Sequence, residues 1–398
     1  MKNYGFNKDR IIETHGRETA DALSEFYSLF KGEAVVWLAK LWDRESGGFY
    51  FSNSARDTEG YEPDIESTGQ AMGVLQDLGI TPDPVTFPED FKNRVVNYFR
   101  ELQDEDGFFY HKKWGRDINT SRRARDLASA SGWIRMLGGS LKYPTAVEQM
   151  KTASESDNGK ESVIPEHLRS REAFLRYLDG LEVSKNSYSA GQIIAMQSSQ
   201  IQAVGLADVC IDYLNSLQLP NGIWDPVLNY SSANGMLKIC HAYNALGRDL
   251  PRLEAVVDAA VSTVFAPEPP LAIVDVFNPL MALHYLRSIV KNTGKPERLE
   301  TLDKILSEKA RDVILTTKEK LIPFRESDGS FAYYPVGHVF GDGQWSQGKI
   351  VAPPAEEGNV NAFQLANACR ILITEALGLE VGLPYTVEDG REIFDILK

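Results

Sequence analysis

The chain has 398 residues, of which 43% are hydrophobic and 25% charged, a composition that supports a large folded core and excludes a chain disordered throughout. The formal net charge is −14 at pH 7, so the surface field repels nucleic-acid phosphates and anionic lipid head groups. We therefore expect neither nucleic acid nor a membrane as a partner, whereas an anionic small molecule stays open because a local cluster of Lys and Arg can override the global sign.

The cysteines and the N-terminus indicate a reducing compartment. Cys210, Cys240 and Cys369 are the only cysteines, too few and of the wrong parity to staple a large domain, so reduced thiols are expected. The opening MKNYGFNKDR lacks the apolar region of a signal peptide, and the chain has no run of about 18 apolar residues. The sequence thus predicts a soluble cytoplasmic protein.

Helical periodicity dominates the chain, and strand-like alternation is confined to short pieces such as 49–51 and 108–110. Two kinds of helix alternate. The first kind is charged and amphipathic, and its members are predicted at 20–42, 91–103, 170–181, 207–217, 253–264 and 298–321. The second kind is rich in Ala, Ser, Gly, Met and Gln, which permit close helix contacts, and its members are predicted at 62–78, 121–137, 188–204, 231–246, 274–289 and 358–377.

Several helices of the second kind end in a Leu-Gly pair, because glycine readily adopts the left-handed conformation that stops a helix. These stops are Gly79, Gly138, Gly247 and Gly378. The alternation predicts an all-α fold of one domain, residues 1–398, in which six outer and six inner helices close into an (α/α)6 toroid with short β-like turns and loops at one end. The polar segment 151–165 is expected to be a surface loop of that domain.

A glycine turn followed by an aromatic residue recurs along the chain, and such self-similarity is typical of repeated supersecondary units. The four copies run from Trp42 to Phe49, Gln103 to Phe109, Gln218 to Trp224 and Arg325 to Phe331.

Two of these copies, Leu214-x3-Gln218-x3-Gly222-x-Trp224 and Phe99-x3-Gln103-x3-Gly107-x-Phe109, resemble the glutamine/tryptophan repeat of squalene cyclases and protein prenyltransferases. The resemblance implies a terpenoid-cyclase-like α/α toroid across most of the chain. In that setting the glutamine caps a helix end and the aromatic packs over the next hairpin, which is an architectural role.

The chemistry of those enzymes does not carry over with the repeat. The cyclase acid motif is Asp-x-Asp-Asp, whereas the nearest strings here begin at Asp64 (Asp-Ile-Glu-Ser) and Asp275 (Asp-Val-Phe-Asn). The adjacent Cys240 and His241 lack the Asp-x-Cys partner that a zinc prenyltransferase needs.

A second resemblance lies in the first 80 residues or so. The segment 41–50, Leu-Trp-Asp-Arg-Glu-Ser-Gly-Gly-Phe-Tyr, followed by Arg56, Asp57 and a helix, resembles the opening of α/α-barrel sugar epimerases. It is more loosely similar to toroid glycoside hydrolases and polysaccharide lyases. This resemblance implies a carbohydrate substrate.

Acidic residues gather where two predicted inner helices begin. Asp57, Asp64 and Glu66 lie at the first entry, and Glu356 and Glu357 at the last. Because the first and last hairpins of a closed ring are neighbours, these loops should face each other, and paired carboxylates are the usual machinery of glycosidic bond hydrolysis. The same acids also fit helix capping, with Asp64 a natural N-cap residue.

Three residues within helices are further candidates. His241 and Tyr243 would serve as base and acid in uronate β-elimination if they line a pocket, and His284 corresponds to the inner-helix histidines of the epimerases. Each also fits a hydrogen-bonded place in the core. No His-x3-His or Cys-x2-Cys spacing is present, so neither a metal nor a cofactor is predicted.

The loop 333–345 combines aromatic residues, glycines and one histidine without helical periodicity, a pattern typical of binding loops. Tyr333, His338 and Trp345 are expected to contact substrate there, and the aromatic faces suit sugar rings or an isoprenoid. Local packing over the last hairpin is the alternative.

Trp114 is expected to play the same part after the second turn. Its neighbour Arg116 offers a cation for a substrate carboxylate, and the Arg-rich run that ends at Asp126 extends that patch. Pairing of these arginines with the acidic loops is the alternative.

The leading hypothesis is a carbohydrate-active enzyme, a glycoside hydrolase or polysaccharide lyase, that acts on a small-molecule or oligosaccharide substrate by carboxylate or His/Tyr acid/base chemistry. A terpenoid-cyclase-like enzyme, a sugar epimerase and a non-catalytic binding toroid are the alternatives. The sequence leaves the oligomeric state open.

Overall fold

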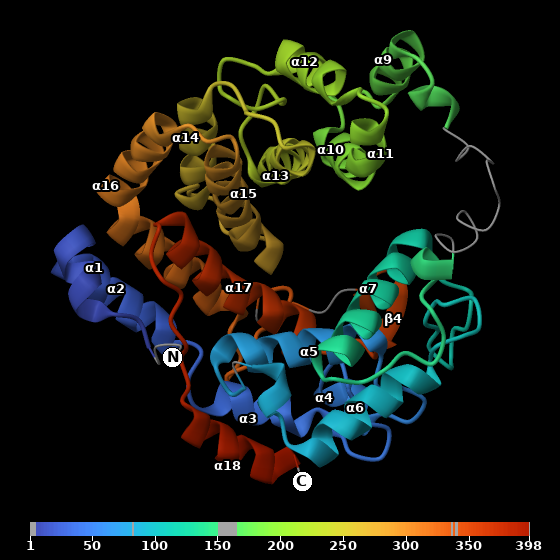
Figure 1. The fold of residues 1–398 in the computed structure, drawn as a ribbon. Coiled ribbons are helices and arrows are strands. Elements are labelled where there is room, and N and C mark those ends of the chain that lie inside the picture. Colours follow the sequence, from blue (N-terminus) through green and yellow to red (C-terminus); the bar gives the residue numbers. More distant parts are fainter. Residues whose placement is uncertain (1–4, 82, 150–164, 336, 339–340, 398) are drawn as a thin grey trace.

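The computed structural model describes residues 5–81, 83–149, 165–335, 337–338 and 341–397. These residues are predominantly helical, with only short strands, which confirms the all-α class (Figure 1). The predicted loop 151–165 lies, except for its last residue, outside the described residues. Within the described part of the chain no helix has the length and apolar character needed to cross a membrane.

The helices rich in small residues pack against one another in succession. They are α5 (Ile65–Leu78), α7 (Thr120–Met136), α10 (Ser187–Met196) with its continuation α11 (Ser198–Ala203), α13 (Tyr230–Leu246), α15 (Ile273–Asn292) and α17 (Val360–Ala376). Contacts run from α10 to α13, α15, α17, α5 and α7 in that order, and Figure 1 shows these helices on the inner side of an arc. A Cβ atom at Gly191 of α10 would lie 2.6 Å from the carbonyl carbon of Lys238 on α13, so the small residues permit this approach.

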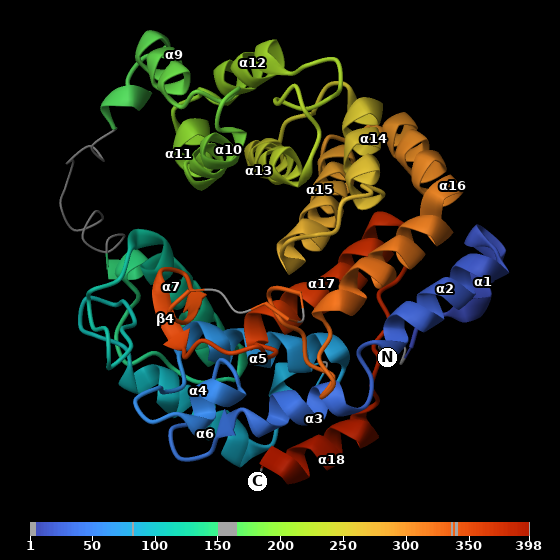
Figure 2. The same cartoon turned by 180° about the vertical axis from the view of Figure 1, so that it is seen from behind.

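The charged helices lie on the outer side (Figure 2). They are α6 (Glu89–Glu101), α9 (Arg171–Gly180), α12 (Ala207–Leu217), α14 (Leu253–Val264) and α16 (Pro296–Leu321). The helix predicted at 20–42 is instead divided into α2 (Arg17–Ser28) and α3 (Glu33–Lys40). Gly32, which has a φ of 76° as the N-cap residue of α3, accommodates the break.

Among the described residues, the helices that the sequence did not predict include three that cover the N-terminus, the first turn and the C-terminal end. They are α1 (Lys8–His15), the one-turn α4 (Asn53–Asp57) and the C-terminal α18 (Val387–Leu397), which packs on α3. One cluster of buried hydrophobic side chains extends through nearly all the helices, and Cys210, Cys240 and Cys369 lie buried in it as free thiols.

Two of the predicted glycine helix stops and one predicted N-cap residue are confirmed. Gly79 and Gly247 adopt the left-handed conformation, with φ of 93° and 63°. Asp64 is the N-cap residue of α5, where its side chain accepts hydrogen bonds from the backbone N–H groups of Glu66 and Ser67.

The glutamines of the two best repeat copies fasten one turn to the loop that follows. Gln103 donates to the carbonyl of Tyr143 at 2.9 Å. Gln218 donates to the carbonyls of Gly222 at 2.8 Å and Pro251 at 3.1 Å. These side chains therefore hold successive hairpins together.

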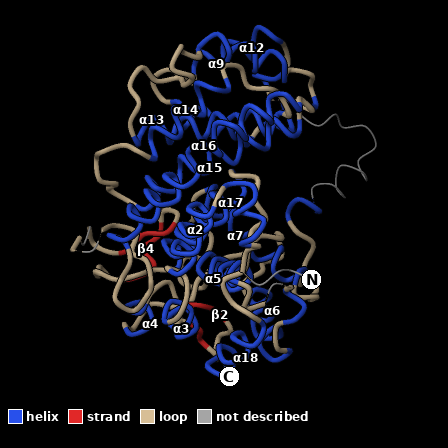
Figure 3. The backbone as a smooth tube through the Cα atoms, turned by 90° about the vertical axis from the view of Figure 1, so that its left-hand side faces the viewer, coloured by secondary structure: helices blue, strands red, loops and turns tan. Residues whose placement is uncertain are grey.

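Two small hairpins lie near the first and last turns, and Figure 3 shows how short their strands are. β1 (Trp42–Asp43) pairs with β2 (Gly48–Phe49), and β3 (Gln344–Ser346) pairs with β4 (Lys349–Ala352). The segment after β2 joins the segment before α17, because Ser52 bridges Asn359 and the N–H of Val360 donates to the carbonyl of Phe51 at 3.0 Å. The first and last turns of the chain are therefore neighbours, as the sequence predicted.

Candidate functional site

A cavity of about 420 Å³ opens beside the junction of the first and last turns. Its wall combines three kinds of side chain. Aromatic rings come from Phe51, Tyr333, Tyr334 and Trp345, amides from Gln344, Asn359 and Asn361, and ionisable groups from His338, Glu356 and Glu357. We call this cavity, defined by these residues, the acidic cavity.

Glu357 is held in place from two directions. Its carboxylate accepts hydrogen bonds from the backbone N–H of Ser54 at 3.0 Å, from the Ser54 hydroxyl, and from Nε2 of Gln344 at 2.6 Å. Ser54 belongs to α4 and Gln344 to β3, so the carboxylate ties the first turn to the hairpin β3–β4. Donors directed at a carboxylate fix its orientation.

Glu356 is exposed and less constrained. One of its oxygens accepts from the N–H of Gly337 at 2.5 Å. Behind it, Glu326 has its Oε1 atom buried without a hydrogen-bond partner. Burial raises the pKa of Glu326, and the nearby charges of Glu356, Asp328 and Glu357 raise it further. Three glutamates thus lie close together, and one of them resists ionisation.

A buried ionic network lies next to this cavity. Arg122 of α7 is fully buried and binds two carboxylates: its Nη2 atom lies 2.6 Å from Asp64, and its Nε atom lies 2.9 Å from Asp126. Its third donor group binds the carbonyl of Ser346 at 3.1 Å. One guanidinium therefore joins α5, α7 and strand β3.

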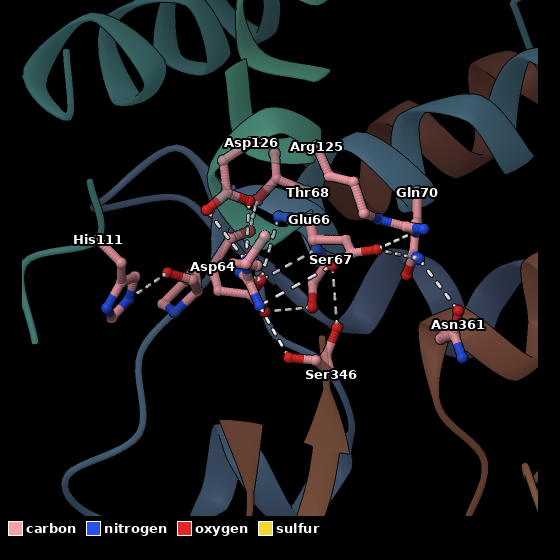
Figure 4. A network of polar contacts seen from close by, with 12 residues as sticks. Asp64, Glu66, Ser67, Thr68, Gln70, His111, Arg125, Asp126, Ser346 and Asn361 are labelled. Atoms are coloured by element: carbon pink, nitrogen blue, oxygen red, sulfur yellow. Dashed lines mark hydrogen bonds and ion pairs between the residues drawn. The ribbon is translucent and has the colours of Figure 1, made fainter. Parts of the chain in front are cut away.

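Glu66 connects the network to the cavity wall. Its carboxylate pairs with Arg125 and accepts from the Ser346 hydroxyl at 3.2 Å and from Nε2 of Gln70 at 3.3 Å. Gln70 also donates to Asn361 at 3.1 Å, and Asn361 lines the cavity. Figure 4 shows Glu66 between Arg125, Ser346 and Gln70, with Asn361 beyond Gln70.

Within the network, the carboxyl group of Asp126 has a raised pKa. Burial raises the pKa of Asp126 to about 7, although Arg122 pulls it down, and Asp64 and Glu66 raise it further. Close by, burial lowers the pKa of His111, whose Nε2 atom lies 3.1 Å from the carbonyl of Pro63. Burial, together with the charges of the two neighbouring carboxylates, outweighs the effect of the one guanidinium, so Asp126 is easily protonated.

Trp345 is 56% exposed and borders a second hollow on its other side. That hollow is also lined by Tyr61, Lys113, Trp114 and Lys349. The ring of Trp114 packs against His111, with centroids 4.2 Å apart, and under the Arg122 guanidinium. The predicted aromatic residues Trp114 and Trp345 thus face one hollow from two distant turns.

The structure therefore brings together nine of the residues predicted from sequence. Those in or beside the two hollows are Asp64, Glu66, Trp114, Asp126, Tyr333, His338, Trp345, Glu356 and Glu357. Asp64 and Asp126 lie behind the wall, each 1% exposed.

The other predicted residues lie elsewhere. Tyr243 is fully buried and donates to Asn215 at 2.6 Å, and His241 stacks on Tyr285 with ring centroids 4.9 Å apart. His284 lies 2.8 Å from the carboxylate of Glu375.

Two predicted residues are at the surface in ion pairs. Asp57 pairs with its neighbour Arg56, and Arg116 with Asp104 and Asp106.

Sequence reasoning missed Gln344, Asn361 and Glu326. The amides carry no motif, and Glu326 lies in the most degenerate copy of the turn repeat. The acid that follows Arg325 in that copy was the available signal.

Among the described residues, no group of three or more His, Cys, Asp or Glu side chains is arranged to hold a metal ion. No known family model matches the chain, and no curated protein matches it.

Proposed function

We propose that the protein is a carbohydrate-active enzyme of the hydrolase or lyase type, cytoplasmic, and built as an (α/α)6 toroid whose acidic cavity binds an oligosaccharide. The observation that carries this proposal is the lining of that cavity, in which exposed aromatic rings, amides and carboxylates face one space. The succession of inner helices from α10 to α7 supports the toroid.

The lining suits a sugar because a sugar ring has two kinds of surface. Its C–H faces pack on aromatic rings such as those of Tyr333 and Trp345, while its hydroxyl groups need hydrogen-bond partners of the kind that Gln344 and Asn361 provide. An isoprenoid would instead remove water from these amides and the two glutamates without adding a hydrogen bond to them, at a cost in binding free energy. The polar lining therefore favours the carbohydrate hypothesis over the terpenoid alternative.

In the proposed chemistry, Glu357 is the general base and Glu356 is the general acid. Glu357, oriented by its three donors, takes a proton; Glu356, which is exposed and accepts a hydrogen bond from Gly337, gives one. In hydrolysis the proton taken comes from water, whose oxygen bonds to the anomeric carbon while the leaving oxygen is protonated. In elimination Glu357 takes the proton from the sugar carbon beside a carboxyl group, a C=C bond forms as the C–O bond on the next carbon breaks, the leaving oxygen takes the proton from Glu356, and no water is added.

Asp64, Glu66 and Asp126 have a positioning role in this proposal. They reach the cavity through Ser346, next to Trp345, and through Gln70 and Asn361. Their contribution is to hold one wall of the cavity rigid.

The test is a panel of neutral and uronate-containing oligosaccharides incubated with the protein and followed by mass spectrometry and absorbance. Fragments whose masses sum to substrate plus water indicate hydrolysis, and an unsaturated product with no added water indicates elimination. Conversion without a mass change would indicate the epimerase alternative.

The Glu357→Gln protein is the control, since it keeps the size of the side chain and removes its base. The proposal fails if no member is converted, or if Glu356→Gln and Glu357→Gln both convert at the wild-type rate.

A further inference from the structure

The hollow on the far side of Trp345 differs from the acidic cavity in charge. The two share Trp345, so they adjoin. The described residues that line the acidic cavity include Glu356 and Glu357 but no Lys or Arg. The described residues that line the second hollow, of about 420 Å³, include Lys113 and Lys349 but no Asp or Glu. The chain has a net charge of −14, so the charge of this hollow is opposite in sign to that of the protein as a whole.

The two lysines are available to a ligand. Lys113 donates to the carbonyl of Gly60 at 2.8 Å and lies over the ring of Tyr61, and no ion pair to it is found among the described residues. Lys349, whose side chain is 20% exposed, pairs with Asp117 at 3.0 Å, and that carboxylate is 95% exposed. Because solvent screens the exposed partner, the pair contributes little, and a ligand anion in the hollow can replace Asp117.

The rest of the hollow provides a surface for a sugar ring. Trp114 and Trp345 come from distant parts of the chain, and each contacts neighbouring side chains. Trp114 packs between His111 and Arg122, and Nε1 of Trp345 donates to Asp342 at 3.3 Å. The hairpin that carries Trp345 and Lys349 is itself anchored by Arg122, which binds Ser346 in β3. The hollow is therefore built on the same buried network as the acidic cavity.

We propose that this hollow is a second subsite, which binds an anionic sugar unit of the substrate while the unit to be converted lies in the acidic cavity. We call it the lysine subsite. This inference rests on the proposed function and narrows its substrate class to saccharides that carry a carboxylate or a sulfate. The bound oligosaccharide passes over Trp345. Its anionic group contacts Lys113 and Lys349, and the next sugar unit contacts Glu356 and Glu357.

The experiment uses matched pairs of oligosaccharides that differ only in charge. One arm compares oligogalacturonates with their methyl esters, and the other compares sulfated with desulfated galactan oligosaccharides. Binding is measured by titration calorimetry and by tryptophan fluorescence, on the wild-type protein and on the Glu357→Gln protein, in which turnover does not consume the ligand. The arm that shows the charge preference identifies the anion.

The charge is then removed from the subsite. In Lys113→Gln/Lys349→Gln the charged member of the preferred pair is expected to bind at least about tenfold more weakly, because the loss of even one charge-assisted contact has that effect, while its neutral partner is unchanged. Lys113→Arg/Lys349→Arg, which keeps both charges, is expected to restore most of the preference.

Lys112→Gln is the matched control. Lys112 is the sequence neighbour of Lys113, is exposed, and pairs with Glu101 at 3.6 Å, outside both hollows. Its replacement removes the same charge from the same loop and is expected to leave binding unchanged.

The outcomes separate the two proposals. If neutral members bind and are converted as well as charged ones, or if the preference survives the double replacement by Gln, the lysine subsite is wrong and the proposed function stands. If no member of either arm and no neutral oligosaccharide binds, the proposed function fails, and the subsite with it.

Discussion

The polar groups around Arg122 and those on α13 and α15 are arranged in opposite ways. Around Arg122, buried carboxylates from two helices and a strand backbone are joined by one guanidinium, and their contacts continue into the wall of the acidic cavity. On α13, Tyr243 donates to Asn215 and its ring lies 6.0 Å from that of Trp224, while His241 stacks on Tyr285 of α15, and none of these residues lines the acidic cavity.

This difference indicates which of the two regions supports the function. Burying several ionised groups costs free energy that apolar packing would not, so such a network persists where it fixes other groups. An isolated hydroxyl with one partner only completes its own hydrogen bond. We therefore expect changes on the Arg122 side to alter both activity and stability, and changes on the α13 side to have small effects.

The largest expected effect is on turnover. Glu357→Gln should lower kcat by about a hundredfold to ten-thousandfold, because an amide cannot take a proton. His241→Gln, the counterpart on α13, should lower it by less than about tenfold. Both are measured on the substrate that the oligosaccharide panel identifies. A larger loss from His241→Gln than from Glu357→Gln would move the catalytic centre to α13 and reverse the comparison.

The next effect is on stability. Arg122→Met removes the cation between Asp64 and Asp126 and leaves two buried carboxyl groups without it, which should lower the free energy of unfolding by about 3–5 kcal/mol. Arg116→Met removes an arginine whose side chain is 65% exposed and should cost no more than about 1 kcal/mol. Urea denaturation of both variants measures the difference. Equal losses would mean that the network has no special structural role.

A third effect concerns pH. The pKa of Asp126 is raised to about 7, so between about pH 4 and pH 7 the folded protein binds more protons than the unfolded chain. The contribution of Asp126 is thus fully present below the unfolded pKa and is lost as the pH rises towards 7. Each unit of raised pKa corresponds to about 1.4 kcal/mol.

Asp126→Asn tests that contribution, because an amide does not titrate. The variant should lose part of the fall in stability between pH 4 and pH 7, whatever its absolute stability. Denaturation curves at several pH values measure the slope, and Asp258→Asn, a replacement of an exposed side chain, serves as the control. An unchanged slope in Asp126→Asn would assign the pH dependence to other groups.

Local sequence signals predicted much of the fold. The predicted bounds 207–217 and 253–264 coincide with those of α12 and α14, because both helices show clear apolar periodicity. The break in 20–42 was missed because Gly32 was read as an ordinary helical residue. The predicted helix 188–204 is divided at Gln197, whose amide is bound by His167 and Tyr177 from other segments, and such a contact leaves no local pattern.

The candidate site was predicted only in part, for the same reason. The adjacency of the first and last turns followed from the repeat, and it brought Glu357 and Trp345 into view. The partners that hold these two side chains could not be predicted, because Ser54 is 303 residues from Glu357 in the sequence. The burial of individual charged side chains could not be predicted either. Nothing in the sequence distinguishes Arg122, which is buried, from Arg116, which is exposed.

The smallest expected effect returns to α13. Tyr243→Phe removes a hydroxyl that donates to Asn215 at 2.6 Å, and Asn215 is half-buried, so water can replace the lost donor. The free energy of unfolding should fall by about 0.5–1.5 kcal/mol, with turnover unchanged. Denaturation and a steady-state assay of one preparation measure both quantities. A large loss of turnover without a loss of stability would give Tyr243 the chemical role first suggested by its place beside His241, and would contradict the contrast between the two sides.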